Sequence, residues 1–279
     1  MSYKTILVHM HDNTRRQALL AAGIGLARIF DAHLIGLSVL PPVIVVPSLG
    51  GGETMVIDDH RTAYATDMSR LKSAFEAATQ GQSFPAEWRQ ADPAYDHAVT
   101  QILEHGRYAD LIIAGQKDAK WHYSEHLEAP DRLVLESGRP VLLLPSTGDA
   151  YEFGKRILVA WNGRREAARA VFDAMPLLQK AQDVVVVWVN PQEAGDAAGD
   201  LPAADICEAL ARHGVNCEAT QNIRPATNVG ATLLDAVRSN GADMLVMGGY
   251  GHSRLREFVL GGATRHVLGA MSVPVLMAH

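Results

Sequence analysis

The sequence contains two copies of one pattern, and this duplication constrains the fold more than any other feature. Residues 3–41 and 154–191 each place a basic residue just before Ile-Leu-Val, then continue through a polar turn, a helix-periodic run and an apolar strand that ends at proline. Residues 108–116 (YADLIIAGQ) and 241–249 (GADMLVMGG) form a second matching pair. Self-similarity at half the chain length indicates a tandem duplication.

The duplication also predicts where the two copies end. Each second element is followed, after a similar interval, by a final strand-like run, at 139–145 and 273–279. The intervening stretch 146–154 is largely small and polar, as a linker should be. We therefore expect two domains, spanning 1–147 and 154–279.

Strand-like and helix-like segments alternate within each half. The strand-like runs are mostly apolar on both faces, as are parallel strands that lie between two layers of helices. This alternation predicts an α/β fold with two tandem, doubly wound, Rossmann-like domains. The expected helices are 15–29, 96–105, 165–178, 203–213 and 226–240, and the expected strands include 6–8, 34–39, 111–113 and 141–144, with more polar edge strands at 86–90 and 218–223.

The longest connection in the first half, 41–60, contains prolines and the run Gly50-Gly51-Gly52. These residues argue against regular structure through the middle of the loop. The sequence leaves three interpretations open, namely a lid, a surface for a protein partner, and a plain surface excursion.

Composition excludes several classes of protein. The chain has 279 residues, of which 48% are hydrophobic and 20% charged, so it can bury a sizeable core. The net charge of -6 and the lack of a basic run argue against nucleic acid as a partner. No apolar run has the length of a membrane span, and the first residues lack a signal-peptide pattern, so we expect a cytoplasmic location. Cys207 and Cys217 form neither a C-x-x-C pair nor a disulfide framework, and we expect them to be packing residues.

A glycine-rich segment, MGGYGHSRLREFVLGGATRHVL at 247–268, is the main functional signal. Gly248 and Gly251 shape the turn after a buried strand, and Gly261-Gly262 precede a predicted helix. A glycine-rich turn before a helix presents backbone N–H groups to an anion, and Thr264 adds a hydroxyl. The alternative, turn geometry alone, stays open, but the whole cluster favours phosphate binding. Its spacing is neither that of a P-loop nor that of a dinucleotide fingerprint.

These residues resemble the universal stress protein family, whose nucleotide-binding members carry G-x2-G-x9-G followed by Ser or Thr. Gly248, Gly251 and Gly261 have this spacing, and ILVAWNG and ILVHMHD resemble the first strand of the family. The similarity covers both halves, so the chain resembles a tandem member of the family.

The resemblance implies that each half is a five-stranded parallel α/β sandwich and that the last strands of the two halves meet. It also implies an adenine nucleotide, ATP or AMP, as ligand of the second half, with or without Mg²⁺. The implied nucleotide site comprises Ala160, Trp161, Asn162, Val189, Met247, Gly248, Gly251, His252, Gly261, Gly262, Ala263 and Thr264.

Two positions of the second half depart from the family pattern. The acidic residue after the first strand is Asn162, which keeps hydrogen-bonding ability but loses the charge. The Ser or Thr after the third glycine is Gly262, which removes one hydroxyl, worth about 1 kcal/mol. These departures allow weaker binding or another phosphorylated ligand.

The first half departs further. Gly251, Gly261 and Gly262 have no glycine counterparts between Gly115 and Pro140, and Asp118, Glu125 and Glu128 would repel phosphate. We therefore predict that the first half has lost the nucleotide site.

Several polar residues carry weaker functional interpretations. His122 and His126, and also His9 and His11, are spaced as metal ligands sometimes are, but no complete metal motif is present, and we assign no metal site. Arg164 and Arg165 either steer anions or simply begin a helix. Trp161 packs either on a base or in the core.

No catalytic residue can be assigned. Ser253 has His252 beside it, but adjacent residues seldom provide nucleophile–base geometry, so we expect slow ATP hydrolysis at most.

Two classes of function remain open. The chain is either a nucleotide-binding regulator or sensor, or a nucleotide-independent stress or scaffold protein that acts through protein partners and the 41–60 loop. An enzyme for a small phosphorylated or adenylylated substrate is a third option, and a homodimer is compatible with the sequence.

Overall fold

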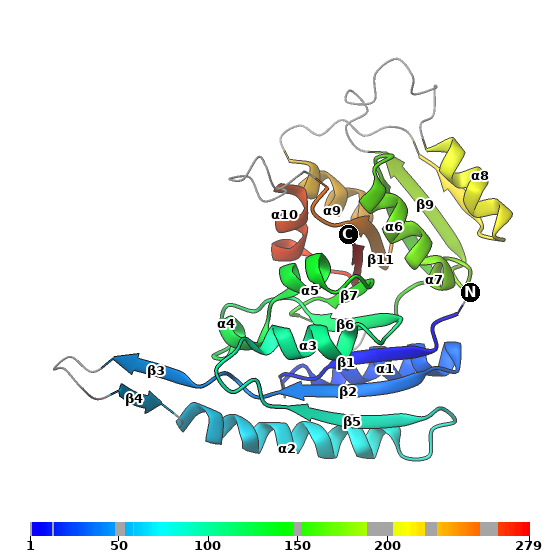
Figure 1. Ribbon diagram of the computed structural model, residues 1–279. Coiled ribbons are helices and arrows are strands. Elements are labelled where there is room, and N and C mark those ends of the chain that lie inside the picture. The colour runs from blue at the N-terminus through cyan, green and yellow to red at the C-terminus, as the bar shows by residue number, and fades with distance from the viewer. Residues whose placement is uncertain are drawn as a thin grey trace. The chain divides into compact units, whose positions relative to one another are not determined.

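The chain folds as two units in a computed structural model that describes residues 2–12, 14–47, 54–57, 59–147, 152–188, 203–220, 228–251 and 262–279. Tyr3–Ser137 form the N-terminal unit. Gly138–Thr147, together with the described residues from 152 to 279, form the C-terminal unit. Figure 1 shows the course of the chain through both units.

The N-terminal unit is built on a parallel sheet with the strand order β5-β2-β1-β6. Its strands are buried runs of β-branched and other apolar residues, except for the more polar edge strand β5. The strands are β1 (Thr5–His9), β2 (His33–Val39), β5 (Ala86–Ala91) and β6 (Leu111–Gly115), and the helices are α1 (Arg16–Phe30), α2 (Asp59–Thr79), α3 (Ala98–Gly106), α4 (Ser124–Leu127) and α5 (Pro130–Glu136).

Helices cover both faces of this sheet. A β-carbon at Gly23 of α1 would lie 2.6 Å from Val8, and one at Gly106 of α3 would lie 2.6 Å from Ile112. Ile112 pairs in register with Leu7, the neighbour of Val8, and successive side chains of a strand point to opposite faces. The two glycines therefore let α1 and α3 approach opposite faces closely.

The segment 41–79 contains regular structure that the sequence interpretation did not anticipate. An antiparallel hairpin of β3 (Ile44–Pro47) and β4 (Thr54–Ile57) is followed directly by the long helix α2 (Figure 1). The middle of the expected irregular loop lies outside the described residues. Helix α2 packs on β2 and β5 through a stripe of buried side chains at helical spacing, Tyr64, Met68, Leu71 and Phe75.

The C-terminal unit repeats the same architecture with the strand order β10-β9-β8-β11-β12-β7. The strands β8 to β12 are parallel to their neighbours. They are β8 (Arg156–Trp161), β9 (Asp183–Trp188), β10 (Cys217–Ala219), β11 (Met244–Gly248) and β12 (Val275–Ala278), and the helices are α6 (Arg165–Asp173), α7 (Met175–Leu178), α8 (Ala204–Arg212), α9 (Val229–Ser239) and α10 (Gly262–Ala270).

The last strands of the two sequence halves pair with each other. Strand β7 (Val141–Leu144) lies antiparallel to β12, with Leu142 opposite Leu276. This pairing places β7 in the C-terminal unit, although its sequence belongs to the first copy of the repeat. The fold class expected from the sequence, with doubly wound parallel sheets in tandem, is confirmed.

Two local expectations are wrong. The helix expected at 165–178 is two helices, because Pro176 lacks the N–H that a helix interior needs and is tolerated in the first turn of α7. The cysteines are not separate packing residues, because Cys207 of α8 and Cys217 of β10 form a disulfide with a Cα–Cα distance of 5.6 Å. Their separation in sequence hid this pairing, since the turn after α8 brings β10 back beside the helix.

Candidate functional site

The strand order of the C-terminal unit reverses between β8 and β11. The chain proceeds outward from β8 to β9 and β10, then returns to the other side of β8 with β11 and β12. Ligands of open α/β sheets bind at such a switch point, beyond the carboxyl ends of the strands. Ala160 and Met247, both expected site residues, are register partners across these two strands. The structure therefore brings the ends of β8 and β11 together.

The end of β8 carries Trp161 and Asn162. Trp161 is partly exposed and pairs in register with Trp188 on β9. The Asn162 Oδ1 atom accepts a hydrogen bond of 3.1 Å from the Arg164 N–H and so shapes the turn into α6. Gly163 completes this turn with a φ of 70°, which favours glycine. Asn162 thus has a local structural role at the rim of the expected site.

Gly248, the first glycine of the motif, lies against the start of α6. A β-carbon there would stand 2.6 Å from the backbone nitrogen of Ala167 and from the backbone carbon of Glu166. The absence of a side chain at Gly248 is therefore required by helix packing. This requirement exists whether or not a ligand binds.

Gly251, the second glycine, faces the buried side chain of Glu166. A β-carbon at Gly251 would lie 3.2 Å from the Glu166 Oε2 atom. The Glu166 carboxylate forms an ion pair with Arg165, and the Arg164 guanidinium lies 3.5 Å from the Gly251 carbonyl oxygen. Both arginines that the sequence singled out are thus beside the glycine turn. The sequence interpretation overlooked Glu166, because one acidic residue at a helix start is common.

Thr264 fixes the exit of the chain from β11. Its Oγ1 atom accepts a hydrogen bond of 3.2 Å from the Tyr250 N–H, and Tyr250 has a φ of 55°. The Gly249 N–H donates to the Ala278 carbonyl oxygen at 2.8 Å. The Thr264 hydroxyl, which is expected to contact phosphate, therefore lies just beyond the carboxyl end of β11 and close to the start of α10.

Gly262, Ala263 and Thr264 are the first three residues of α10. Gly262 is exposed, and a β-carbon there would have no atom of the described residues within 4 Å. The Ala263 carbonyl oxygen, in contrast, would lie 2.7 Å from a β-carbon at Gly230 of α9. Three expected site residues, Val189, His252 and Gly261, lie outside the described residues.

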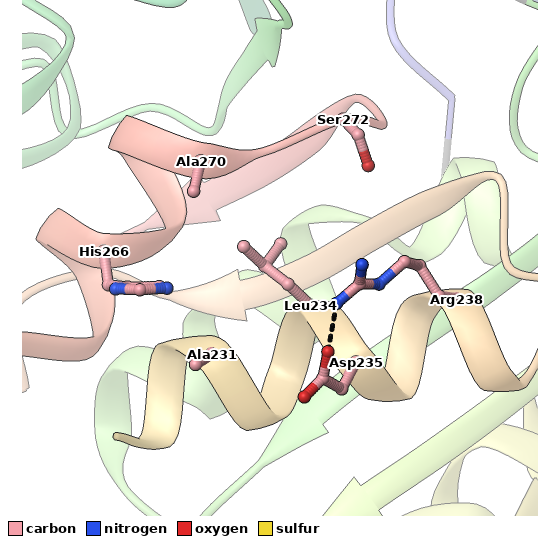
Figure 2. Close-up of a pocket in the computed structure, with 7 residues that line it drawn as sticks. All are labelled: Ala231, Leu234, Asp235, Arg238, His266, Ala270 and Ser272. Carbon is pink, nitrogen blue, oxygen red and sulfur yellow. Dashed lines mark hydrogen bonds and ion pairs between the residues drawn. The ribbon is translucent and has the colours of Figure 1, made fainter. Parts of the chain in front are cut away.

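A shallow pocket lies between α9 and α10, away from the strand ends. Figure 2 shows its lining, in which Asp235 and Arg238 of α9 form an ion pair and His266 projects from α10. The pocket has a volume of about 300 Å³ and also includes Ala231, Leu234, Ala270 and Ser272. None of the expected site residues that the structure describes lines it.

The histidine pairs differ from the helical or metal-binding arrangements considered above. His122 precedes the short helix α4, which contains His126, so the two do not share one helical turn. The rings of His9 and His11 stack with their centroids 4.7 Å apart. In the part of the chain that the structure describes, no group of three or more His, Cys, Asp or Glu residues is arranged to hold a metal ion.

Comparison with known proteins relates the second half to one family. The sequence profile of the universal stress protein family matches residues 154–279. Universal stress protein Slr1230 of Synechocystis sp. is 25% identical over 171 residues, which are 60% of this chain and 57% of that protein. The chain thus matches a little over half the length of this curated relative.

Solved structures share the fold of the whole chain. A universal stress protein from Archaeoglobus fulgidus has a TM-score of 0.71 and 18% identity, with 98% of this chain and 95% of that chain covered. A putative universal stress protein from Pseudomonas aeruginosa has a TM-score of 0.58 and 18% identity, with 99% and 93% covered. Both similarities extend over the two units and support a shared tandem architecture.

Proposed function

Residues 154–279 of this chain belong to the universal stress protein family, and from this membership we propose that they bind an adenine nucleotide, ATP or AMP, at the carboxyl ends of β8 and β11. The bound nucleotide would make the chain a regulator or sensor in the stress response. The observation that carries this proposal is the register pairing of Ala160 with Met247 at the switch point.

The charges around the glycine turn support an anionic ligand. Arg165 neutralises the Glu166 carboxylate, so the cation beside the turn is Arg164, which contacts the Gly251 carbonyl oxygen. The start of α10 adds backbone N–H groups that a helix leaves without intrahelical partners. We propose that Gly251, His252 and the segment from Gly261 to Thr264 receive the phosphates.

The end of β8 offers groups that suit the base and the ribose of a nucleotide. Trp161 offers an aromatic face and Asn162 an exposed amide. We propose that these residues, with Val189, contact the adenosine moiety, with or without Mg²⁺ on the phosphates.

The cytoplasmic location and a homodimer remain predictions. None of the described helices combines the length and the apolar character that a bilayer span needs.

Calorimetric titration with ATP, ADP and AMP, each with and without Mg²⁺, tests the proposal. We expect one site per chain in the wild-type protein and loss of binding in Gly251→Val, whose branched side chain would cover the turn. Among the described residues, a β-carbon at Gly251 would meet only the end of the Glu166 side chain, at 3.2 Å, so we expect the fold to accommodate the change.

Gly269→Ala is the matched control. No atom lies within 4 Å of a β-carbon at this exposed position of α10, so binding should be unchanged. Absence of binding to the wild-type chain at millimolar nucleotide would overturn the proposal and favour a scaffold that acts through protein partners. Binding that survives in Gly251→Val would show that the site lies elsewhere.

A further inference from the structure

A buried carboxylate in the N-terminal unit is surrounded by four hydrogen-bond donors. The side chain of Glu128 is 1% exposed. Its Oε1 atom lies 3.0 Å from the His11 Nε2 atom and 3.1 Å from the Arg15 guanidinium. Its Oε2 atom accepts from the Ser124 hydroxyl at 2.6 Å and from the Asp118 backbone N–H at 2.7 Å. Each carboxylate oxygen therefore has two hydrogen-bond donors, as in a preorganised binding site for an oxyanion.

Arg15 also brings a positive charge to this carboxylate, with which it forms a buried ion pair. The His11 Nδ1 atom lies 3.1 Å from the His9 carbonyl oxygen, so both ring nitrogens of His11 face acceptors. Burial alone would raise the pKa of Glu128, but the hydrogen bonds from His11, Ser124 and Asp118 outweigh it and hold that pKa below its usual value. The Glu128 carboxylate thus faces the Arg15 guanidinium and a ring nitrogen of His11.

The position of Glu128 in the repeat corresponds to that of a motif glycine in the second copy. Glu128 follows Gly115 at the same interval as Gly261, the third motif glycine, follows Gly248. Asp118, whose N–H contacts the carboxylate, stands at the position of Gly251 by the same count. In the first copy, a side chain with its own negative charge has replaced the glycine.

Arg15 has a counterpart in the second copy as well. Arg15 and Arg164 are the residues that immediately precede α1 and α6. Gly115 lacks a side chain where the Arg15 guanidinium passes, since a β-carbon there would lie 2.6 Å from the guanidinium nitrogen. The first copy thus has a cation, Arg15, and the Asp118 backbone N–H at the switch point between β1 and β6.

We propose that the N-terminal unit contains an oxyanion cradle, formed by His11, Arg15, Ser124 and the Asp118 N–H, that its own Glu128 permanently fills. Removal of this side chain beyond Cβ converts the cradle into a site for a small free oxyanion. Because Glu128 supplies the anion, the N-terminal unit needs no phosphorylated ligand to satisfy these donors. This inference does not depend on nucleotide binding by the C-terminal unit.

Anion rescue of Glu128→Ala in the full chain tests the proposal. The substitution removes a fragment equivalent to acetate, so acetate and inorganic phosphate are the probes, with chloride at matched ionic strength as reference. We expect the midpoint of thermal unfolding, Tm, to fall in Glu128→Ala. Acetate, phosphate or both should then raise it in a saturable way, because a ligand that binds the folded state stabilises it. The response is measured as the difference from the wild-type chain, which cancels any anion bound elsewhere.

Three further variants make the result specific. Glu128→Gln keeps the cradle filled by a neutral group, so its Tm should fall without any response to the anions. The double variant Glu128→Ala/Arg15→Met should lose at least most of the response. Glu125→Ala is the matched control, because Glu125 is exposed and pairs with Lys117, and it should behave like the wild-type chain.

The proposal fails if Glu128→Ala responds to neither anion, or if it responds no more than Glu125→Ala does. It also fails if Glu128→Ala is as stable as the wild-type chain in chloride. If Glu128→Ala is not folded when purified, the refolded yield in acetate or phosphate relative to chloride gives the same readout. An equal yield in all three salts would overturn the proposal.

Discussion

Gly248 lies against the first turn of α6, where a β-carbon would stand 2.6 Å from the backbone nitrogen of Ala167. Backbone atoms cannot yield as a flexible side chain can, so we expect Gly248→Ala to lower the free energy of unfolding by about 1–3 kcal/mol. Urea denaturation measures this loss. Gly262→Ala, whose β-carbon would meet no atom within 4 Å in the described part of the chain, should stay within about 0.5 kcal/mol of the wild-type chain. Equal stability of the two variants would contradict this packing role.

The sequence predicted much of the architecture, because each buried strand is a local pattern and the repeat shows directly when the two halves are compared. The run Val184–Val187, for example, is apolar on both faces and is fully enclosed in β9. The sequence does not reveal helix α2, because many charged residues lie between its buried side chains and lower the mean hydropathy of the helix. Local patterns thus identify strands better than a helix with one narrow apolar face.

The site was less predictable, because its contacts join segments that are far apart in sequence. Gly248 was interpreted as a place for a phosphate to approach, but its close neighbour is α6, which only the tertiary fold reveals. Glu128 was interpreted as a group that repels phosphate. Its four donors come from residues 11, 15, 118 and 124, so no short motif indicates that the carboxylate itself takes the place of an anion.

An aspartate in each copy ties the start of the first strand, β1 or β8, to the start of the neighbouring strand, β6 or β11. The Asp110 carboxylate accepts from the N–H groups of Lys4 and Thr5 at 2.7 and 3.0 Å, and the Asp243 carboxylate accepts from Gly154 and Lys155 at 2.8 and 3.0 Å. We expect Asp110→Ala and Asp243→Ala each to lower the free energy of unfolding by about 1–2 kcal/mol, the lower part of the range for charged hydrogen bonds, because both carboxylates are partly exposed.

Chemical denaturation of the two aspartate variants measures this effect. Asp235→Ala is the control, because Asp235 is an exposed residue of α9 whose partner, Arg238, lies on the same helix. Its substitution should change stability by less than about 0.5 kcal/mol. If Asp110→Ala and Asp243→Ala behave like this control, the two carboxylates do not anchor the strands.

His9 makes the stability of the chain depend on pH. Burial, and secondly the neighbouring His11, lower the pKa of His9 well below 6.5. As the pH falls through about 6.5, the unfolded chain therefore takes up a proton that the folded chain does not, and stability is lost. The contribution is fully present above this pH and is about 1.4 kcal/mol smaller at pH 5.5.

The free energy of unfolding at pH 7.5 and 5.5, compared between the wild-type chain and His9→Gln, measures the contribution of His9. Glutamine keeps a polar side chain but does not titrate, so the variant should lose less stability between the two pH values. The Nε2 atom of His9 is buried without a hydrogen-bond partner among the described residues, so the variant breaks no hydrogen bond of that atom. Identical losses in both proteins would rule out His9 as the titrating group.

The disulfide between Cys207 and Cys217 closes a short loop that joins α8 to the edge strand β10. A cross-link with a sequence separation of 10 restricts the unfolded chain, and this restriction is worth about 2–3 kcal/mol. We expect dithiothreitol to lower the Tm of the oxidised protein and to leave the Tm of Cys207→Ser/Cys217→Ser unchanged. A thiol assay on the denatured, oxidised chain should find no free cysteine. Two free thiols, together with a Tm that does not respond to the reductant, would show that the pair stays reduced.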